Sequence, residues 1–370
     1  MFLYIEMKSA YKKLFSLIAI LAVSTGQAQV QNRIIIPDID GYKTLQCDFH
    51  IHTVFSDGLV WPTVRVDEAY REGLDAISLT DHLEYRPHNR DIVATHNRPY
   101  EIAKPSAESN DLILIRGSEI TRSMPPGHFN AIFLNDCDAL AKDEWRDSFA
   151  EAKRQNAFII WNHPAWDAQQ PDTTLWWKEH TEIYNNGWMN GIEVVNEHTY
   201  SEDAFQWGLE KKLTLMGNSD IHDPIHHDID FIKGEHRALT LVFAKERTMD
   251  AIRDALENRR TAVFHKELLI GEEQYLRSIF ENSIEIINID KGDNRITINF
   301  QNKSGLTFLL KKTTHDENVV YFRELEIKPY CRHSITIRFT GDSNDGKFNF
   351  EVTNLLVKPG KGLICSYNLF

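Results

Sequence analysis

The chain has 370 residues, of which 42% are apolar and 26% are charged. This composition is typical of a folded globular protein and excludes disordered, collagen-like and mostly membrane-embedded chains. Lys and Arg number 41 against 54 Asp and Glu, which gives a formal net charge of −13. Because proteins that clamp a nucleic-acid backbone need a basic face, we expect no nucleic-acid partner.

The N-terminal residues have the pattern of an export signal. Lysines at positions 8, 12 and 13 precede an apolar run over 14–23, and Gly26 and Ala28 are small residues at suitable positions for cleavage. The alternative is an N-terminal membrane anchor, but the run is shorter than the roughly 20 residues that a span requires. We therefore predict a signal peptide at 1–28, a periplasmic or secreted protein, and no stable membrane insertion after cleavage.

Between residues 29 and 270, short apolar runs alternate with helical patterns. The helical patterns cover 63–72, 201–212 and 248–258, and Gly73 follows the first of them as a stop signal. Strands that alternate with helices predict a parallel sheet in an α/β layer or barrel. The predicted strands are 44–52, 74–80, 112–116, 128–134, 157–161, 191–195, 213–217 and 238–244.

Residues 271–370 have a different texture and form a separate predicted domain. Apolar and polar residues alternate in short runs, and polar turns such as 291–294 and 340–346 separate them. This pattern predicts a small antiparallel β-sandwich. Its predicted strands are 284–289, 295–300, 307–312, 334–339 and 347–352.

The four cysteines contain no Cys-x-x-Cys pair, so a thiolate zinc site is not expected. Cys331 and Cys365 lie in the same C-terminal segment. They either pair in an oxidising compartment or stay two separate buried thiols, and the sequence leaves both readings open.

The ends of the predicted strands carry metal-type side chains. His50 and His52 are two residues apart at the end of an apolar strand, so both face the same side. Two imidazoles in this arrangement can bind one metal ion, although a lone His-x-His is weak evidence. Strand ends of α/β barrels converge at one mouth, where so many polar groups are costly to bury unless they bind cations. The further strand-end residues are Asp57, Asp81, His82, Glu119, His128, His163, Asp220 and His222.

The ordered motifs HIH, SDG, TDH, GSE, GH, NHP and SDIH, over about residues 45–265, resemble the PHP (polymerase and histidinol phosphatase) family of metal-dependent phosphoesterases. The resemblance implies an α/β fold class: a distorted (β/α)7 PHP barrel, here followed by the small antiparallel β-sandwich domain. It also implies two or three divalent metal ions at the barrel mouth. Segments 60–88 and 119–128 look like a narrower exported group, the Sb-PDE type phosphodiesterases.

The family pattern, carried over position by position, implies nine metal ligands. Some relatives have His where this chain has Asp57. A set of imidazoles and carboxylates without thiolate suits Zn, Mn or Fe. The implied reaction is attack of a metal-bridging hydroxide on phosphorus in a small organic phosphate diester, with Glu119 as the bridging carboxylate. The implied ligands are His50, His52, Asp57, His82, Glu119, His128, His163, Asp220 and His222.

Four residues are candidates for a catalytic role: Glu119, Arg122, Arg86 and Asp81. Arg122 and Arg86 closely follow implied ligands, and either guanidinium can fork onto phosphate oxygens. The alternative is an ordinary surface arginine paired with a carboxylate. Asp81 can act as a general acid or base, or orient an imidazole from behind. Glu193 can support a ligand from beneath.

Two other functions remain open at this point. The same metal site can hydrolyse a phosphomonoester, an amide or a carboxyl ester. A non-enzymatic protein that binds a partner through its β-domain is the third reading, but a degenerate barrel is expected to have lost ligands, and none is missing here. The leading expectation is an exported metal-dependent phosphoesterase that acts on a small-molecule phosphate ester.

Overall fold

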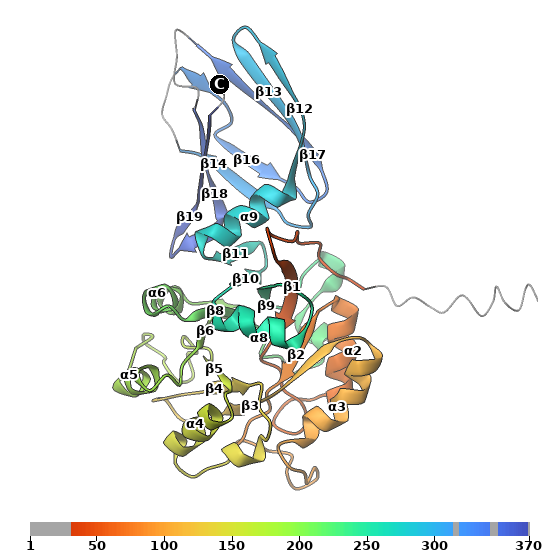
Figure 1. Cartoon of the computed structure of the whole chain (residues 1–370), viewed down its shortest axis with the longest axis vertical. Coiled ribbons are helices and arrows are strands. Elements are labelled where there is room, and N and C mark those ends of the chain that lie inside the picture. The colour runs from red at the N-terminus through yellow and green to blue at the C-terminus, as the bar shows by residue number, and fades with distance from the viewer. Residues whose placement is uncertain (1–30, 314–317, 341–346, 369–370) are drawn as a thin grey trace, which may run out of the picture. The chain divides into compact units, whose positions relative to one another are not determined.

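The N-terminal part of the computed structural model is a curved sheet of eight strands (Figure 1). The structure describes residues 31–313, 318–340 and 347–368, so the predicted signal peptide at 1–28 lies outside it. The eight strands correspond to those predicted from the apolar runs. In sheet order they are β9 (Leu239–Ala244), β1 (Lys43–Asp48), β2 (Ala76–Leu79), β3 (Ile113–Ile120), β4 (Phe129–Ile132), β5 (Phe158–Trp161), β6 (Gly191–Asn196) and β8 (Thr214–Asn218).

The prediction of a parallel sheet is only partly correct. β1, β2 and β3 are parallel, as are β5, β6 and β8, but β4 is antiparallel to both its neighbours. β9 is likewise antiparallel to β1. The connection from β3 to β4 covers only residues 121–128, which is too short for the dozen or more residues of a parallel crossover. As a result, the start of β4 lies at the same edge of the sheet as the end of β3.

Three helices form where the sequence predicts them: α2 (Pro62–Glu72), α6 (Glu202–Lys211) and α8 (Met249–Glu257). Gly73 ends α2 with a φ of 76°, and the side chains of Ser201 and Thr248 cap α6 and α8 by accepting backbone N–H groups. The other helical elements and a small strand complete this part. They are α3 (Arg98–Ser109), α4 (Trp145–Arg154), α5 (Lys178–Asn185), α7 (Ile225–Asp228), η1 (Asp138–Leu140), η2 (Phe231–Lys233) and β7 (Thr199–Tyr200).

The sheet does not close with a complete ladder. Among the described residues, β8 forms a ladder only with β6, and none with β1 or β9. A single isolated bridge, Ile51 to Ile221, joins the ends of β1 and β8. We call this gap between β8 and β1 the barrel seam. Side-chain hydrogen bonds also cross the barrel seam: Asn218 accepts the N–H of Phe49, and Ser219 donates to Asp48.

The C-terminal part consists of two sheets of mainly antiparallel strands, as the alternating pattern predicts. β10 (Thr261–His265), β11 (Leu268–Gly271) and α9 (Glu273–Ser283) lead into it. One sheet is β12 (Ile284–Gly292), β13 (Arg295–Asn302), β17 (Arg332–Phe339) and β15 (Val319–Val320). The other is β16 (Glu324–Ile327), β14 (Phe308–Lys312), β18 (Lys347–Lys358) and β19 (Lys361–Asn368). Strand β11 pairs in parallel with β18, so this second sheet continues into that of the barrel.

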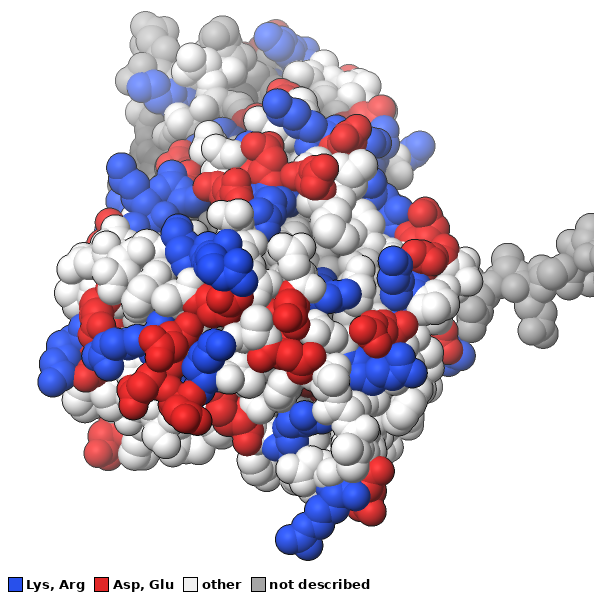
Figure 2. Space-filling view, turned by 60° about the horizontal axis from the view of Figure 1, so that its bottom comes forward, with Lys and Arg blue, Asp and Glu red and all other residues white. Residues whose placement is uncertain are grey.

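Charged side chains of both signs lie interspersed on the face drawn in Figure 2. Short ion pairs also occur among the exposed side chains of the described residues, such as Arg146 with Glu182 at 2.6 Å. No helix of the described segments is long and apolar enough to cross a membrane. All four cysteines are free. Cys331 is exposed and Cys365 is buried, so the structure contains neither the disulfide nor a pair of buried thiols.

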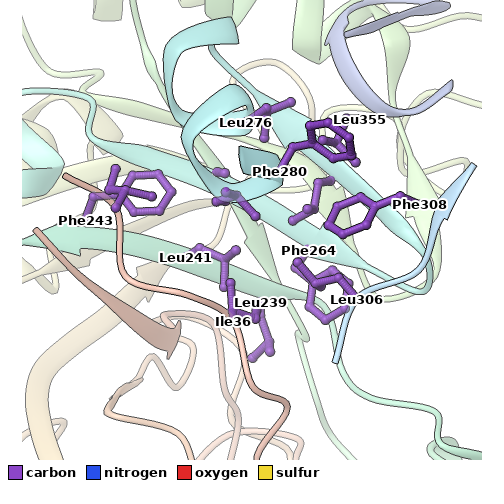
Figure 3. Close-up of a cluster of buried hydrophobic side chains, with 14 of the residues drawn as sticks. Ile36, Leu239, Leu241, Phe243, Phe264, Leu276, Phe280, Leu306, Phe308 and Leu355 are labelled. Carbon is purple, nitrogen blue, oxygen red and sulfur yellow. The ribbon is translucent and has the colours of Figure 1, made fainter. Parts of the chain in front are cut away.

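A buried hydrophobic cluster connects the barrel strands to the C-terminal sheets (Figure 3). It contains Leu241 of β9, Phe280 of α9, Phe308 of β14 and Leu355 of β18, each with at most 5% of its surface exposed. Fully burying one such side chain contributes about 1.5–3 kcal/mol. The cluster therefore stabilises both parts of the chain together.

Candidate metal centre

The nine implied ligands lie together at the mouth of the barrel. His50 and His52 follow β1, His82 follows β2, and Glu119 lies in the last part of β3. His128 immediately precedes β4, so the antiparallel turn brings it to the same edge as Glu119. His163 follows β5, and Asp220 and His222 follow β8.

The ligand atoms form four overlapping groups whose members lie within 4.8 Å of one another. Glu119 belongs to two groups, as do His50, His52 and His82. The overlap joins the four groups into one continuous cluster. The groups are His52, Asp57, His82 and His222; His50, Glu119 and His163; His50, His52 and Asp220; and His82, Glu119 and His128.

Several buried atoms of these side chains have no hydrogen-bond partner in the described structure. Asp220 Oδ1 lies 3.0 Å from both His50 Nε2 and His52 Nε2, yet none of the three atoms makes a hydrogen bond. Glu119 Oε2 and Asp57 Oδ1 are likewise unpartnered. A buried polar atom left in this state costs about 1–3 kcal/mol. Divalent cations satisfy such atoms, and a set of imidazoles and carboxylates is what Zn, Mn and Fe accept. The residues therefore fit a multi-metal site.

Glu193, in β6, holds two of the ligands from beneath. Its Oε1 lies 2.9 Å from His50 Nδ1 and accepts a hydrogen bond from Asn218. Its Oε2 accepts hydrogen bonds from the backbone N–H of His163 and from Asn196. A proton held on His50 Nδ1 by Glu193 leaves Nε2 with its lone pair toward the centre. The position of Glu193 is the one that its strand suggested.

Asp81 is buried and fixes the turn that follows His52. Its carboxylate accepts hydrogen bonds from the backbone N–H and hydroxyl of Thr53 and from Ser56 Oγ, all at 2.8–2.9 Å. Ser56 Oγ in turn lies 3.3 Å from His52 Nδ1. Burial raises the pKa of Asp81, against the opposing effect of these hydrogen bonds. These contacts orient the turn that carries Asp57 and the ring of His52.

Burial and neighbouring charges shift the imidazoles in opposite directions. Burial and the charges of His222 and His82 lower the pKa of His52 to about 3. Burial also acts to lower the pKa of His82, but the charge of Glu119 and its neighbours outweighs it and raises that pKa to about 10. The neutral His52 ring can therefore donate a lone pair, while His82 must release a proton before it binds a cation.

Two of the ligands have a strained backbone. His163 has a φ of 29° and Asp220 a φ of 50°, in the left-handed region that residues other than Gly rarely adopt. Such a conformation costs of order 1–3 kcal/mol and persists where the surrounding structure enforces it. In each case it turns the chain directly after a barrel strand.

The two arginine candidates are engaged outside the mouth. Arg86 donates to the backbone carbonyls of Phe55 and Ala94 at 3.2 and 2.8 Å. Arg122 pairs with Glu84 at 2.8 Å and donates to two backbone carbonyls of the segment before α4. Neither side chain lines the cleft at the mouth. Their role in phosphate binding stays a prediction.

The mouth opens into two clefts. The main cleft has a volume of about 450 Å³ and is lined by six of the ligands together with the exposed Trp166, Asp167 and Glu197. A second cleft of about 290 Å³ shares Glu197, Asp220 and His222 with it. No Lys or Arg of the described residues lines the main cleft.

Sequence reasoning did not find the polar residues that hold the ligands from behind. Asn162 donates to Glu119 at 3.0 Å, and Asn196 donates to Asp220 at 3.3 Å. Thr121 Oγ1 lies 2.6 Å from His82 Nδ1. Asn162 has a weak signal, because it stands beside a ligand in the NHP motif. Asn196 has none, because its partner is brought close only by the fold.

Comparison with known proteins shows what the chain is similar to. A family model described as an Ig-like domain matches residues 283–368. Among curated proteins, nothing matches the chain. A crystal structure from Bacteroides vulgatus, of a two-domain protein containing a predicted PHP-like metal-dependent phosphoesterase, has 56% sequence identity and a TM-score of 0.91. The match covers 92% of this chain and 100% of that one.

Two further structures are less similar. A predicted metal-dependent phosphoesterase from Bifidobacterium adolescentis has 17% identity and a TM-score of 0.41, covering 58% of this chain and 96% of its own. An amidohydrolase from Chromobacterium violaceum has 14% identity and a TM-score of 0.37, covering 49% and 89%. These two likenesses are too weak to bear on the fold or the function. The 56% identity to the B. vulgatus protein over nearly the whole chain shows the family: the chain belongs to the PHP-like metal-dependent phosphoesterases.

Proposed function

We propose that the protein hydrolyses small organic phosphate diesters with two or three divalent ions of Zn, Mn or Fe. The observation that carries the proposal is the convergence of nine imidazole and carboxylate side chains on one mouth, with buried ligand atoms left without hydrogen-bond partners. Divalent ions held there lower the pKa of a coordinated water and neutralise charge on phosphoryl oxygens. Membership of the PHP-like family supports the phosphate ester as the bond that is cleaved.

The position of Glu119 suits a carboxylate shared between ions. Its Oε1 lies 2.9 Å from His128 Nδ1, while its Oε2 lies 2.7 Å from His82 Nδ1 and 3.7 Å from His50 Nε2. The two oxygens thus face different histidine groups. Asp57 Oδ1 lies 3.2 Å from His222 Nε2, which suits a ligand to an ion of the one group that contains both residues.

Two clefts at one centre favour a diester over a monoester. A diester has two organic groups on phosphorus, and each needs room beside the ions. The main cleft and the second cleft meet at Asp220 and His222, so the two groups have separate places to lie. A monoester would need only one of them.

A small substrate is favoured over a nucleic acid. The carboxylates Asp167 and Glu197 line the main cleft without a Lys or Arg among its described lining, whereas a nucleic-acid channel tracks its backbone with cations. Export to the periplasm or the medium remains part of the proposal and rests on the sequence of residues 1–28 alone.

The proposal is tested with three chromogenic substrates: bis-p-nitrophenyl phosphate, p-nitrophenyl phosphate and p-nitrophenyl acetate. The purified protein, loaded with Zn, Mn or Fe in turn, is expected to hydrolyse the diester with the highest kcat/KM. The variant His50→Ala should abolish this activity, whereas Glu235→Gln, an exposed substitution outside the clefts, should not change it. Turnover of the monoester or the acetate alone would overturn the diester assignment and support hydrolysis of another bond.

A further inference from the structure

Arg65 is a fully buried arginine of α2 whose side chain has no exposed surface. Its Nε donates to the carbonyl of His52 at 2.8 Å. Its Nη2 donates to the carbonyls of Ile221 and His222 at 3.1 and 2.6 Å. Its Nη1 donates to the carbonyl of Asp223 and to Glu68, both at 2.8 Å. Five hydrogen bonds thus use the full donor capacity of the guanidinium.

These contacts lie across the barrel seam. His52 belongs to the segment after β1, and residues 221–223 belong to the segment after β8. Backbone contact between the two segments is sparse: His52 N–H donates to Ile221 O at 3.1 Å, and Leu59 N–H donates to His222 O at 2.8 Å. No strand ladder of the described residues joins β8 to β1. The rigid planar fork of Arg65 therefore spans the place where the sheet itself does not close.

The metal groups differ in whether they cross the seam. One group takes His50 and His52 from one side and Asp220 from the other, and a second takes His222 from the far side. The remaining two groups, which both contain Glu119, use only residues from β1 to β5 and the loops that follow. A change in the width of the seam therefore alters the first two groups and leaves the last two in place.

We infer that Arg65 is a positioning residue for the metal centre. Its guanidinium sets the distance across the barrel seam between the ligands after β1 and those after β8, and so sets the affinity of the two ion groups that cross it. Arg65 does not touch the ions or the substrate. The inference rests on the proposed metal-dependent function, but it names a determinant that lies outside the ligand motifs.

The test compares metal retention by the wild type, Arg65→Met and Arg65→Lys. Methionine keeps most of the apolar volume without donors, and lysine keeps the charge but has three donors in place of five and cannot reach all four carbonyls. We expect binding of the seam-crossing ions to weaken by about 10- to 100-fold, as is typical when a partner behind metal ligands is lost. At least one ion, held by the groups that contain Glu119, should keep its affinity within threefold. Elemental analysis and competition with a chromogenic chelator measure both quantities.

The matched control is Arg260→Lys. Arg260 is also a buried arginine and donates to the carbonyl of Phe243, but it lies just before β10, outside the metal groups and both clefts. The control should destabilise the protein without a selective loss of ions. Equal weakening of every ion in Arg65→Met, or unchanged ion content in a folded Arg65→Met, would overturn the inference.

A second measurement does not depend on metal. In chelator, Arg65→Met should accelerate amide hydrogen exchange at His52 and Leu59 by more than tenfold relative to the amides of β4, and Arg260→Lys should not. If Arg65→Met does not fold, Glu68→Gln replaces it, because Glu68 orients the guanidinium and should give the same pattern more weakly. Unaltered exchange at both amides would contradict the role of Arg65 in holding the two sides of the barrel seam together. Failure of the wild type to bind any metal would instead refute the proposed function.

Discussion

Glu193 offers the sharpest test of how the metal centre is held. Its two carboxylate oxygens face four N–H groups at 2.8–2.9 Å, two at each oxygen. In Glu193→Gln the amide group must face two of these donors in either orientation, and each unsatisfied buried donor costs about 1–3 kcal/mol. The metal-free variant should therefore lose about 2–6 kcal/mol in its free energy of unfolding. Because His50 also loses its orienting carboxylate, metal affinity should fall about 10- to 100-fold.

The stability change is measured by guanidinium chloride unfolding in chelator, and the affinity by competition with a chromogenic chelator. Glu197→Gln is the control, because Glu197 lines the same cleft while its carboxylate accepts no hydrogen bond from any described residue. A Glu193→Gln protein with wild-type stability and wild-type metal affinity would refute this reading of the carboxylate.

Three further predictions concern stability and support of the site. Burial lowers the pKa of His180 to about 4. As the pH falls, this histidine is protonated in the unfolded chain before it is protonated in the folded one. The contribution of His180 to the free energy of unfolding is therefore complete above about pH 6.5 and is lost as the pH falls toward 4, by up to about 3 kcal/mol. In chelator, His180→Phe should flatten the pH dependence of urea unfolding; an unchanged slope would contradict this. Phe308→Ala should cost about 3–5 kcal/mol in denaturant unfolding, because Phe308 is fully buried, and a loss below about 1 kcal/mol would argue against the shared core. Asp81→Asn should release Ser56 and the turn before Asp57, lowering metal affinity about tenfold in chelator competition, and equal affinity would show that this turn is held otherwise.

Much of the fold could be predicted because the barrel strands fall on short apolar runs, several of which are followed directly by polar residues. The same local rule identified the metal-type side chains, since strand ends at one edge meet in space. The helix α3 was missed because Pro99 and Pro105 fall within it and obscure its pattern. The seam and its arginine were not predictable, because Arg65 meets carbonyls far away along the chain and carries no local signal. The antiparallel turn into β4 was within reach, since the loop at 121–128 is too short for a parallel crossover.

Counting the bound ions decides whether the strand-end residues form one multi-metal site. The purified protein is incubated with Zn, Mn or Fe, freed of excess metal, and analysed for metal content beside Glu119→Gln, which alters a carboxylate that belongs to two groups. We expect at least two divalent ions per wild-type chain and fewer in the variant, with bis-p-nitrophenyl phosphate hydrolysis lost in parallel. A folded wild-type protein that takes up no divalent ion would contradict this expectation.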